Sequence, residues 1–170
     1  MSKRSAPLEP YEPMFRKRNR QWEKQNLSRK AVYRGIDPKL ALRVKFIAGE
    51  LQTPEGEVAR AVIEYALSSY GRGDFDLDPR PKPYHARMTL YPDSMRGEER
   101  RRKPPQSAWR VITTWRGFPP ELKKELTSLA SGDGLNVPIG ELITALLRFG
   151  LAAYATGLLT LDTPNPEDAV

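Results

Sequence analysis

The sequence predicts a mainly α-helical fold with a short two-stranded antiparallel β-ribbon, built from two tandem strand–helix–helix units. The first observation behind this prediction is an internal repeat: RGIDPKLALRVKFIA begins at Arg34 and returns as RGFPPELKKELTSLA at Arg116. After a two-residue insertion, TPEGEVARAVIEYALSSY from Thr53 lies over VPIGELITALLRFGLAAY from Val137. The second observation is that each copy opens with a β-type run and continues with two one-sided apolar stripes.

Corresponding positions of the two copies keep their apolar, aromatic or glycine character, whereas the polar positions between them differ. The matching pairs are Ile36/Phe118, Leu40/Leu122, Val44/Leu126, Ile47/Leu129, Val58/Leu142, Tyr65/Phe149, Leu67/Leu151, Tyr70/Tyr154, Gly73/Gly157 and Leu77/Leu161. One copy holds roughly 50 residues, which is near the lower limit for a core that is stable by itself. The two copies are therefore expected to share one core.

Each copy is expected to begin with a strand. The segments Ser28 to Ile36 (SRKAVYRGI) and Trp109 to Phe118 (WRVITTWRGF) are rich in β-branched and aromatic residues, and proline follows both. A helix should come next, because Pro38 falls in its opening turn and apolar residues then recur at helical spacing. In the first copy these are Leu40, Val44, Ile47 and Leu51, and in the second Leu122, Leu126 and Leu129.

A second helix is expected in each copy. In the first, Thr53 can act as the N-cap with Pro54 at the first helical position. In the second, Val137 cannot cap, so Asn136 has to substitute. These helices should close near residues 71–73 and Gly157, and their apolar stripes are Val58, Val62 and Tyr65 in one copy and Leu142, Leu146 and Phe149 in the other.

The chain divides into five parts on this basis. Residues 1–27 form a basic arm, 28–77 the first unit, 78–107 a linker, 108–163 the second unit and 164–170 a tail. The linker is rich in proline and carries RGEERRRK from Arg96, which argues against a regular core element, although a short ordered piece around Met88 to Tyr91 is compatible with it.

Composition limits the function classes. The 170 residues carry a formal charge of +7 with a pI near 9.7, which favours an anionic partner such as nucleic acid or an acidic protein surface. No cysteine is present, which excludes disulfides and thiolate chemistry and suits a reducing cytoplasm. The N-terminus does not read as a signal peptide, and Leu135 to Leu161 reads as a buried helix, not a membrane span.

The repeated unit resembles the ribbon-helix-helix superfamily, the MetJ/Arc-like DNA-binding proteins. RGIDPKL with TPEGEV carries the resemblance in the first copy, and RGFPPEL with VPIGEL in the second, over about 105 of the 170 residues. The resemblance implies that two units pair their strands into an antiparallel ribbon that enters the major groove, while the second helices offer their N-termini to phosphates.

Both units lie in one chain, so we expect an intramolecular pseudo-dimer, similar to the tandem ribbon-helix-helix proteins known among DNA-transfer accessory factors. The linker is long enough, at roughly 3.3 Å per extended residue, to bring the second strand to an antiparallel start. We expect a monomer that acts as a pseudo-dimer, with higher assembly on DNA possible. Because the two halves differ, the preferred site should be asymmetric.

Alternation along the strands divides the ribbon into two faces. The base-contacting candidates on one face are Lys30, Val32, Arg34, Arg110, Thr114 and Arg116, accompanied by Ile112. Arginine can donate twice to guanine, and threonine can contact thymine. Ile36 and Phe118 share this parity yet should be core residues, so a bulge or kink at Gly35 and Gly117 has to reverse the facing. Without it, Tyr33, Thr113 and Trp115 would face DNA.

Phosphate contacts are expected from Thr53 and from the arm residues Arg16, Lys17, Arg18 and Arg20. Each of these candidates has a structural alternative. The ribbon arginines could bridge helix carboxylates, Thr53 could be an ordinary helix cap, and the arm could be a solvated tail.

No catalytic residue, metal site or cofactor is expected. His85 is the only histidine and lies in the linker, and no phosphate-binding loop is present. Tyr91 reads as a solvated linker tyrosine. We therefore expect a cytoplasmic, nucleoid-associated transcriptional regulator that binds double-stranded DNA. The alternatives are an accessory factor of DNA transfer or partition, and an antitoxin-like module whose arm or linker binds a protein partner.

Overall fold

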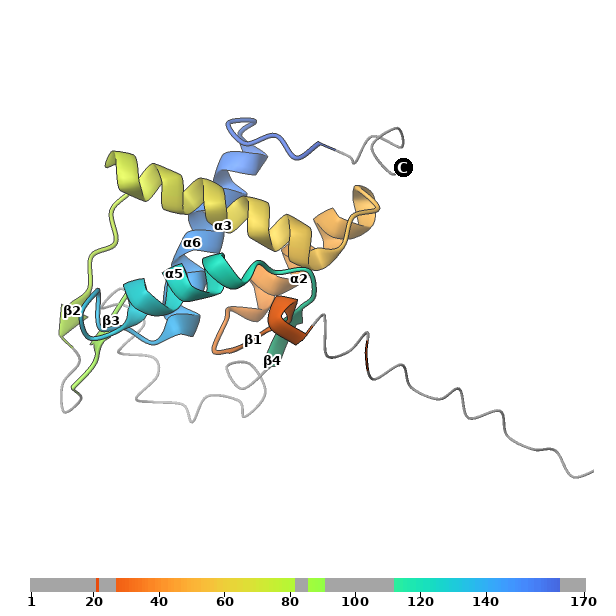
Figure 1. Ribbon diagram of the computed structural model, residues 1–170. Helices are drawn as coiled ribbons and strands as arrows, with labels where there is room; N and C mark the ends of the chain where they lie inside the picture. The colour runs from red at the N-terminus through yellow and green to blue at the C-terminus, as the bar shows by residue number, and fades with distance from the viewer. Residues whose placement is uncertain (1–20, 22–26, 82–85, 91–111, 163–170) are drawn as a thin grey trace, which may run out of the picture.

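The computed structural model describes residues 21, 27–81, 86–90 and 112–162. Figure 1 shows the two long helices α3 (Glu55–Arg72) and α6 (Ile139–Ala155) crossing at the centre, with α2 (Pro38–Glu50) and α5 (Pro120–Ala130) beside them. A two-stranded ribbon of β1 (Ala31–Arg34) and β4 (Ile112–Trp115) lies at the lower edge. The predicted fold class, mainly helical with a short antiparallel β-ribbon, is confirmed at this level.

The ribbon joins segments that lie far apart in the sequence. β1 pairs antiparallel with β4 in the register Ala31↔Trp115, Val32↔Thr114, Tyr33↔Thr113 and Arg34↔Ile112. β1 is shorter than its predicted segment because Leu27–Arg29 forms a 3-10 turn before it and Gly35 ends it. Residues 109–111, where the second strand was expected to begin, lie outside the described part of the chain.

One hydrophobic core receives side chains from both copies, as expected. α3 and α6 approach so closely that a Cβ atom on Gly150 would lie 2.6 Å from the carbonyl oxygen of Val62. The predicted stripes point into this core. Val44, Ile47, Val58, Val62, Leu122, Leu126, Leu142 and Leu146 are buried, and Leu40, Leu51, Leu129 and Phe149 are partly buried against them. Tyr65 is half-buried, and its ring stacks on that of Phe149.

Two predicted helix caps are wrong. The N-cap position of α3 is taken by Pro54, and the Thr53 hydroxyl donates instead to the carbonyl of Leu51 at 3.2 Å. Because Thr53 precedes the helix by one residue too many, its hydroxyl cannot serve the first free N–H groups. Likewise Pro138 takes the N-cap position of α6, and the Asn136 side chain donates to the carbonyl of Ala86 at 3.0 Å. Pro38 does open α2, as predicted.

The start of the linker is more regular than expected. β2 (Arg80–Pro81) pairs antiparallel with β3 (Met88–Thr89), which confirms an ordered piece at Met88, whereas the strand at Arg80–Pro81 was not expected. Long-range contacts explain the difference, since the N–H of Met88 donates to the Asn136 carbonyl at 2.8 Å. Tyr91 and the remainder of the linker lie outside the described residues.

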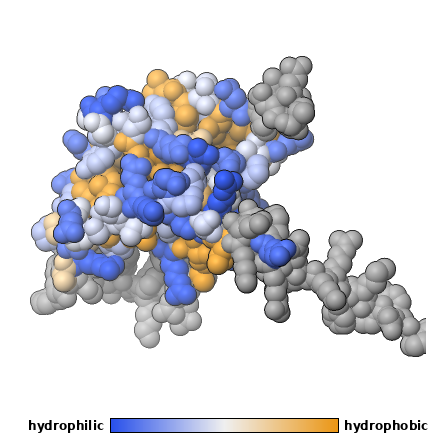
Figure 2. Space-filling model, viewed as in Figure 1, coloured by the Kyte–Doolittle hydropathy of each residue, from blue (hydrophilic) through white to orange (hydrophobic). Residues whose placement is uncertain are grey.

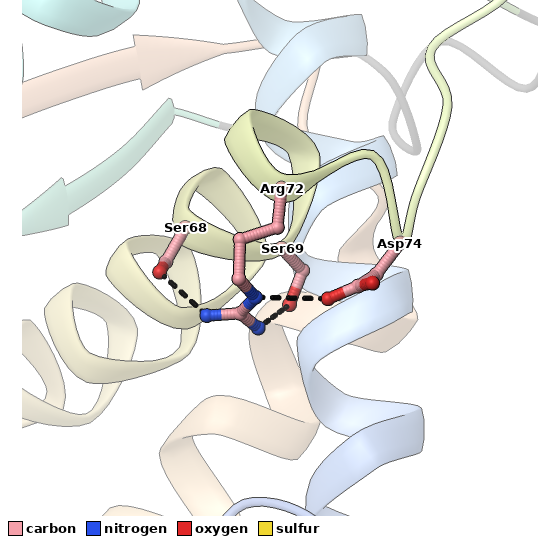
Figure 3. Close-up of polar contacts among 4 residues, drawn as sticks. All are labelled: Ser68, Ser69, Arg72 and Asp74. Carbon is pink, nitrogen blue, oxygen red and sulfur yellow. Dashed lines mark hydrogen bonds and ion pairs between the residues drawn. The ribbon is translucent and has the colours of Figure 1, made fainter.

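The C-terminal end of α3 is fixed by Arg72, whose guanidinium contacts three side chains (Figure 3). Its Nε donates to Asp74 at 2.9 Å, and its two terminal nitrogens donate to Ser68 at 3.0 Å and Ser69 at 3.2 Å. This cluster lies at the end of α3 that leads to β2. The N-terminal end of the same helix faces the ribbon.

Candidate nucleic-acid interface

The β1–β4 ribbon has one buried and one exposed face. Ala31 and Trp115 are each 1% exposed and Tyr33 is 7% exposed, whereas Val32 and Ile112 are 51% and 49% exposed. Lys30, Arg34, Thr114 and Arg116 are also exposed. The predicted outward residues within the described part of the chain therefore share one solvent-facing surface, which we call the ribbon face: Lys30, Val32, Arg34, Ile112, Thr114 and Arg116.

A kink at each strand end lets the arginines point outward while the next apolar residue turns inward. Gly35 and Gly117 have φ angles of +80° and +77°, which side chains other than glycine rarely adopt. Ile36 and Phe118, which strict alternation would expose, are 1% and 0% exposed. The alternative in which Tyr33, Thr113 and Trp115 face outward is wrong, because Tyr33 and Trp115 are buried and Thr113 is half-buried.

The register arranges the ribbon face as three rungs. Val32 lies opposite Thr114 in the middle, and Arg34 lies opposite Ile112 at one end. The same register carried one residue further places Lys30 opposite Arg116 at the other end. The strands still run together there, because the N–H of Phe118 donates to the carbonyl of Arg29 at 2.8 Å. Each end of the face thus holds one arginine.

The cations of the ribbon face have no partner among the residues that the structure describes. Within the described residues Lys30, Arg34 and Arg116 make no side-chain hydrogen bond or ion pair. Arg60 on α3 differs, since it lies 3.0 Å from Glu64 and 3.7 Å from Glu57, and the Glu64 contact raises the pKa of its guanidinium. The suggestion that the ribbon arginines bridge helix carboxylates therefore has no support in this part of the chain.

One lysine that the sequence analysis did not single out holds the start of β1. The Lys123 ammonium on α5 donates to the carbonyls of Ser28 at 2.9 Å and Lys30 at 3.0 Å. The matching position of the first copy is Ala41, so the repeat gave no signal for this contact. It fixes the backbone at the Lys30–Arg116 end of the ribbon face.

The first turns of α3 and α6 pack reciprocally on the ribbon ends. A Cβ atom on Gly56 would overlap the carbonyl oxygen of Arg116, and one on Gly140 would overlap that of Arg34. Each second helix therefore touches the strand end of the other copy. The sequence carried a signal for these positions, because the same glycine recurs in TPEGEV and VPIGEL.

A hydroxyl strengthens one of these two junctions. The N–H of Asp37 donates to the Thr144 hydroxyl at 3.1 Å, and that hydroxyl donates to the Gly140 carbonyl at 2.7 Å. The other junction lacks this arrangement. The residue that matches Asp37 is Pro119, which has no N–H to donate, and the residue that matches Thr144 is Arg60.

The N-terminal turns also differ in what covers them. Glu141 in the first turn of α6 is 7% exposed and accepts hydrogen bonds from the Thr89 hydroxyl at 2.9 Å and the Leu90 N–H at 3.0 Å. Its counterpart Glu57 on α3 has a side chain that is 44% exposed and lies beside Arg60. No side chain of the described residues caps either helix.

Aromatic packing supports the back of the ribbon. The Tyr33 ring meets Trp115 and Phe118 edge-on at centroid distances of 6.0 and 6.1 Å, and Trp115 stacks on Phe118 at 5.7 Å. The buried Tyr33 hydroxyl has no hydrogen-bond partner among the described residues, and burial raises its pKa to about 12.

The remaining predicted contact residues are either engaged elsewhere or lie outside the described part of the chain. Thr53 is half-buried, and its hydroxyl is engaged with Leu51. Arg110 and the arm residues Arg16, Lys17, Arg18 and Arg20 lie outside the described residues, as do His85 and Tyr91. Within the described ranges no group of three metal-ligating side chains could hold an ion, and no helix is long and apolar enough to span a bilayer.

Comparison of the chain with protein-family models, with curated proteins and with solved structures finds no match. Any functional assignment therefore comes from the geometry of the ribbon and of the helices that flank it.

Proposed function

We propose that this protein binds double-stranded DNA sequence-specifically by inserting the β1–β4 ribbon into the major groove. The observation that carries the proposal is the ribbon face, where an arginine without a partner in the described part of the chain lies at each end of an exposed two-stranded ladder. The major groove is about 12 Å wide and admits a two-stranded ribbon. Arginine can donate to guanine O6 and N7, and apolar side chains can contact thymine methyl groups.

The two units act, in this proposal, as tandem ribbon-helix-helix units that form an intramolecular pseudo-dimer. Matching positions of the two copies contact each other. Val32 is the cross-strand partner of Thr114, and the Tyr65 ring stacks on the Phe149 ring with their centroids 6.1 Å apart. The reciprocal contacts of Gly56 and Gly140 follow the same rule. These relationships are expected if an approximate two-fold axis passes through the middle rung and between α3 and α6.

Phosphate binding is proposed at the first turns of α3 and α6. Both turns lie against the ribbon ends through Gly56 and Gly140, and both lack a side-chain cap. Free N–H groups at a helix start, together with the helix dipole, favour a phosphate. The backbone of these turns, and not the Thr53 hydroxyl, is the better anchor, because that hydroxyl already donates to Leu51.

Both ends of the ribbon face hold an arginine, but the residue opposite the arginine on the neighbouring strand differs between the two ends. The approximate axis relates the Lys30–Arg116 rung to the Ile112–Arg34 rung, so lysine at one end corresponds to isoleucine at the other. We propose that the Arg116 half-site offers an additional acceptor to Lys30, while the Arg34 half-site offers a thymine methyl to Ile112. The preferred duplex is then an imperfect inverted repeat.

Selection of bound duplexes from a random pool, followed by binding measurements over a range of salt, tests the proposal. We expect an enriched asymmetric site and a steep fall of affinity with salt, corresponding to roughly 6 to 10 phosphates. If no duplex binds in a salt-sensitive manner, the proposal is wrong, and the antitoxin-like interaction module becomes the better hypothesis.

Within DNA binding, we favour a transcriptional regulator over an accessory factor of transfer or partition. The genomic position of the selected site separates them. A site beside a promoter supports regulation, whereas one at a transfer origin or a repeat array supports the accessory role.

A further inference from the structure

Helix α2 carries an exposed apolar ridge. Leu42 and Phe46 are 65% and 66% exposed, and they lie one turn apart on the same helix face. Lys39, Arg43 and Lys45 are exposed around them and form no ion pair within the described residues. Figure 2 shows hydrophobic residues reaching the surface in separate patches between hydrophilic ones. The α2 ridge is thus an apolar strip bordered by positive charge.

The matching face of α5 has the opposite character. The positions equivalent to Lys39 and Arg43 are Glu121 and Glu125, and those equivalent to Leu42 and Phe46 are Lys124 and Ser128. All four are exposed. The two outer helices of one chain therefore present unlike surfaces at matching places, with cations on α2 where α5 has carboxylates.

An open groove of about 440 Å³ lies beside this face of α5. Leu67 and Tyr70 of α3 and Leu129 of α5 give it an apolar floor, and Glu125 and Asp133 place carboxylates at it. Within the described residues neither carboxylate is in an ion pair. The α5 groove, as we call it, combines the two features that the α2 ridge would need in a partner.

We propose that the α2 ridge of one chain docks into the α5 groove of a second copy. Phe46 and Leu42 would cover the apolar floor, and Arg43 with its neighbouring lysines would face Glu125 and Asp133. Because ridge and groove are different surfaces, the contact is heterologous, and each pair of chains keeps one free groove and one free ridge. Such a contact continues head to tail and suits side-by-side copies on a duplex.

Sedimentation velocity of the full-length chain over a range of concentrations, at low and high salt, tests this inference. It goes beyond the proposed function, and because no DNA is present the result does not depend on whether the ribbon binds a duplex. We expect the mean mass to rise with concentration at low salt and to return to that of one chain at high salt. A mass of one chain at all concentrations would overturn the inference.

Single charge reversals locate the contact. Arg43→Glu and Glu125→Arg should each weaken association by about tenfold or more, because each replaces an attractive pair with a repulsive one. Phe46→Ser, which installs the residue that α5 has at the matching position, should weaken it as well. Arg87→Glu is the matched control, since it changes the charge equally at an exposed position outside both surfaces and should leave association intact.

Mixing the two reversed variants distinguishes the mode of contact. The Glu125→Arg chain retains a functional ridge, and the Arg43→Glu chain retains a functional groove. Together they should regain association, because the intact ridge of one variant meets the intact groove of the other, and in the remaining contact the two reversed charges are again opposite in sign. If Glu125→Arg alone still associates like the unaltered protein, the ridge does not use this groove and the inference is overturned. Circular dichroism of each variant verifies that these exposed changes leave the fold intact.

Discussion

Gly56 in the first turn of α3 lies so close to Arg116 at the end of β4 that no side chain fits between the helix and the Arg116 carbonyl oxygen. Gly140 of α6 has the same relationship to Arg34 at the end of β1. These two contacts set how far the helix starts stand from the outward arginines. They therefore connect the packing of the core to the geometry of the ribbon face.

Gly56→Ala and Gly140→Ala should each destabilise the fold by about 1 to 3 kcal/mol, because the added methyl group forces the helix away from a backbone carbonyl. Urea unfolding followed by circular dichroism measures the loss. Gly71→Ala is the matched control on α3, since a Cβ atom there meets nothing within 4 Å, and it should be neutral or stabilising by about 0.5 to 1 kcal/mol. Equal stability of all three variants would contradict the close approach.

Arg34→Ala and Arg116→Ala should each cost about 1 to 3 kcal/mol of binding at the selected duplex, because each removes a side chain assigned to a base edge. The melting temperature should hardly change, since neither side chain has a partner within the described residues. Fluorescence anisotropy with the selected and a scrambled duplex measures the effect. An equal loss on both duplexes would reduce these arginines to phosphate contacts.

Lys30→Ile makes the two ends of the ribbon face alike, with arginine beside isoleucine at both. The duplex selected by this variant should be closer to a perfect inverted repeat than that selected by the unaltered protein. Binding to the original site should fall by about 1 to 3 kcal/mol, because the acceptor assigned to Lys30 is left unused. Arg87→Ile is the control, because it removes a positive charge at a position outside the ribbon and should not change the selected sequence. If Lys30→Ile selects the same duplex as the unaltered protein, Lys30 does not cause the asymmetry of the site.

Local patterns in the sequence were sufficient to predict the ribbon, its faces and the stripes of the four helices. Alternation fixed which residues share a face, and glycine after each arginine predicted the kink that reconciles Arg34 with the buried Ile36. Contacts between distant segments were not predictable in this way. The Lys123 contact with β1 has no counterpart in the repeat, and the docking of Thr89 on Glu141 depends on where the linker meets α6.

Thr89→Val should destabilise the protein by about 1.5 to 3 kcal/mol. The buried Glu141 carboxylate loses the hydrogen bond that the Thr89 hydroxyl donates to it, and this bond stands in for the hydration that the carboxylate has in the unfolded chain. Urea unfolding at neutral pH measures the change. Thr127→Val is the matched control, since that exposed hydroxyl only donates back to the carbonyl of Lys123 within its own helix. If the two variants lose the same stability, Thr89 does not fasten the linker to α6.

Tyr33→Phe should stabilise the protein by about 1 kcal/mol at neutral pH. The substitution removes a buried hydroxyl that has no partner among the described residues, and it keeps the ring contacts with Trp115 and Phe118.

Burial raises the pKa of Tyr33 from 10.0 to about 12, so between these pH values the unfolded chain loses this proton while the folded chain retains it. The folded state then binds more protons than the unfolded state, and stability falls as pH rises through this window, by up to about 2 kcal/mol from this one group. Urea unfolding of both proteins at a series of pH values measures the difference, and the advantage of Tyr33→Phe should widen above pH 10. A constant difference from pH 7 to 12 would show that the Tyr33 hydroxyl is solvated or bonded in the folded protein.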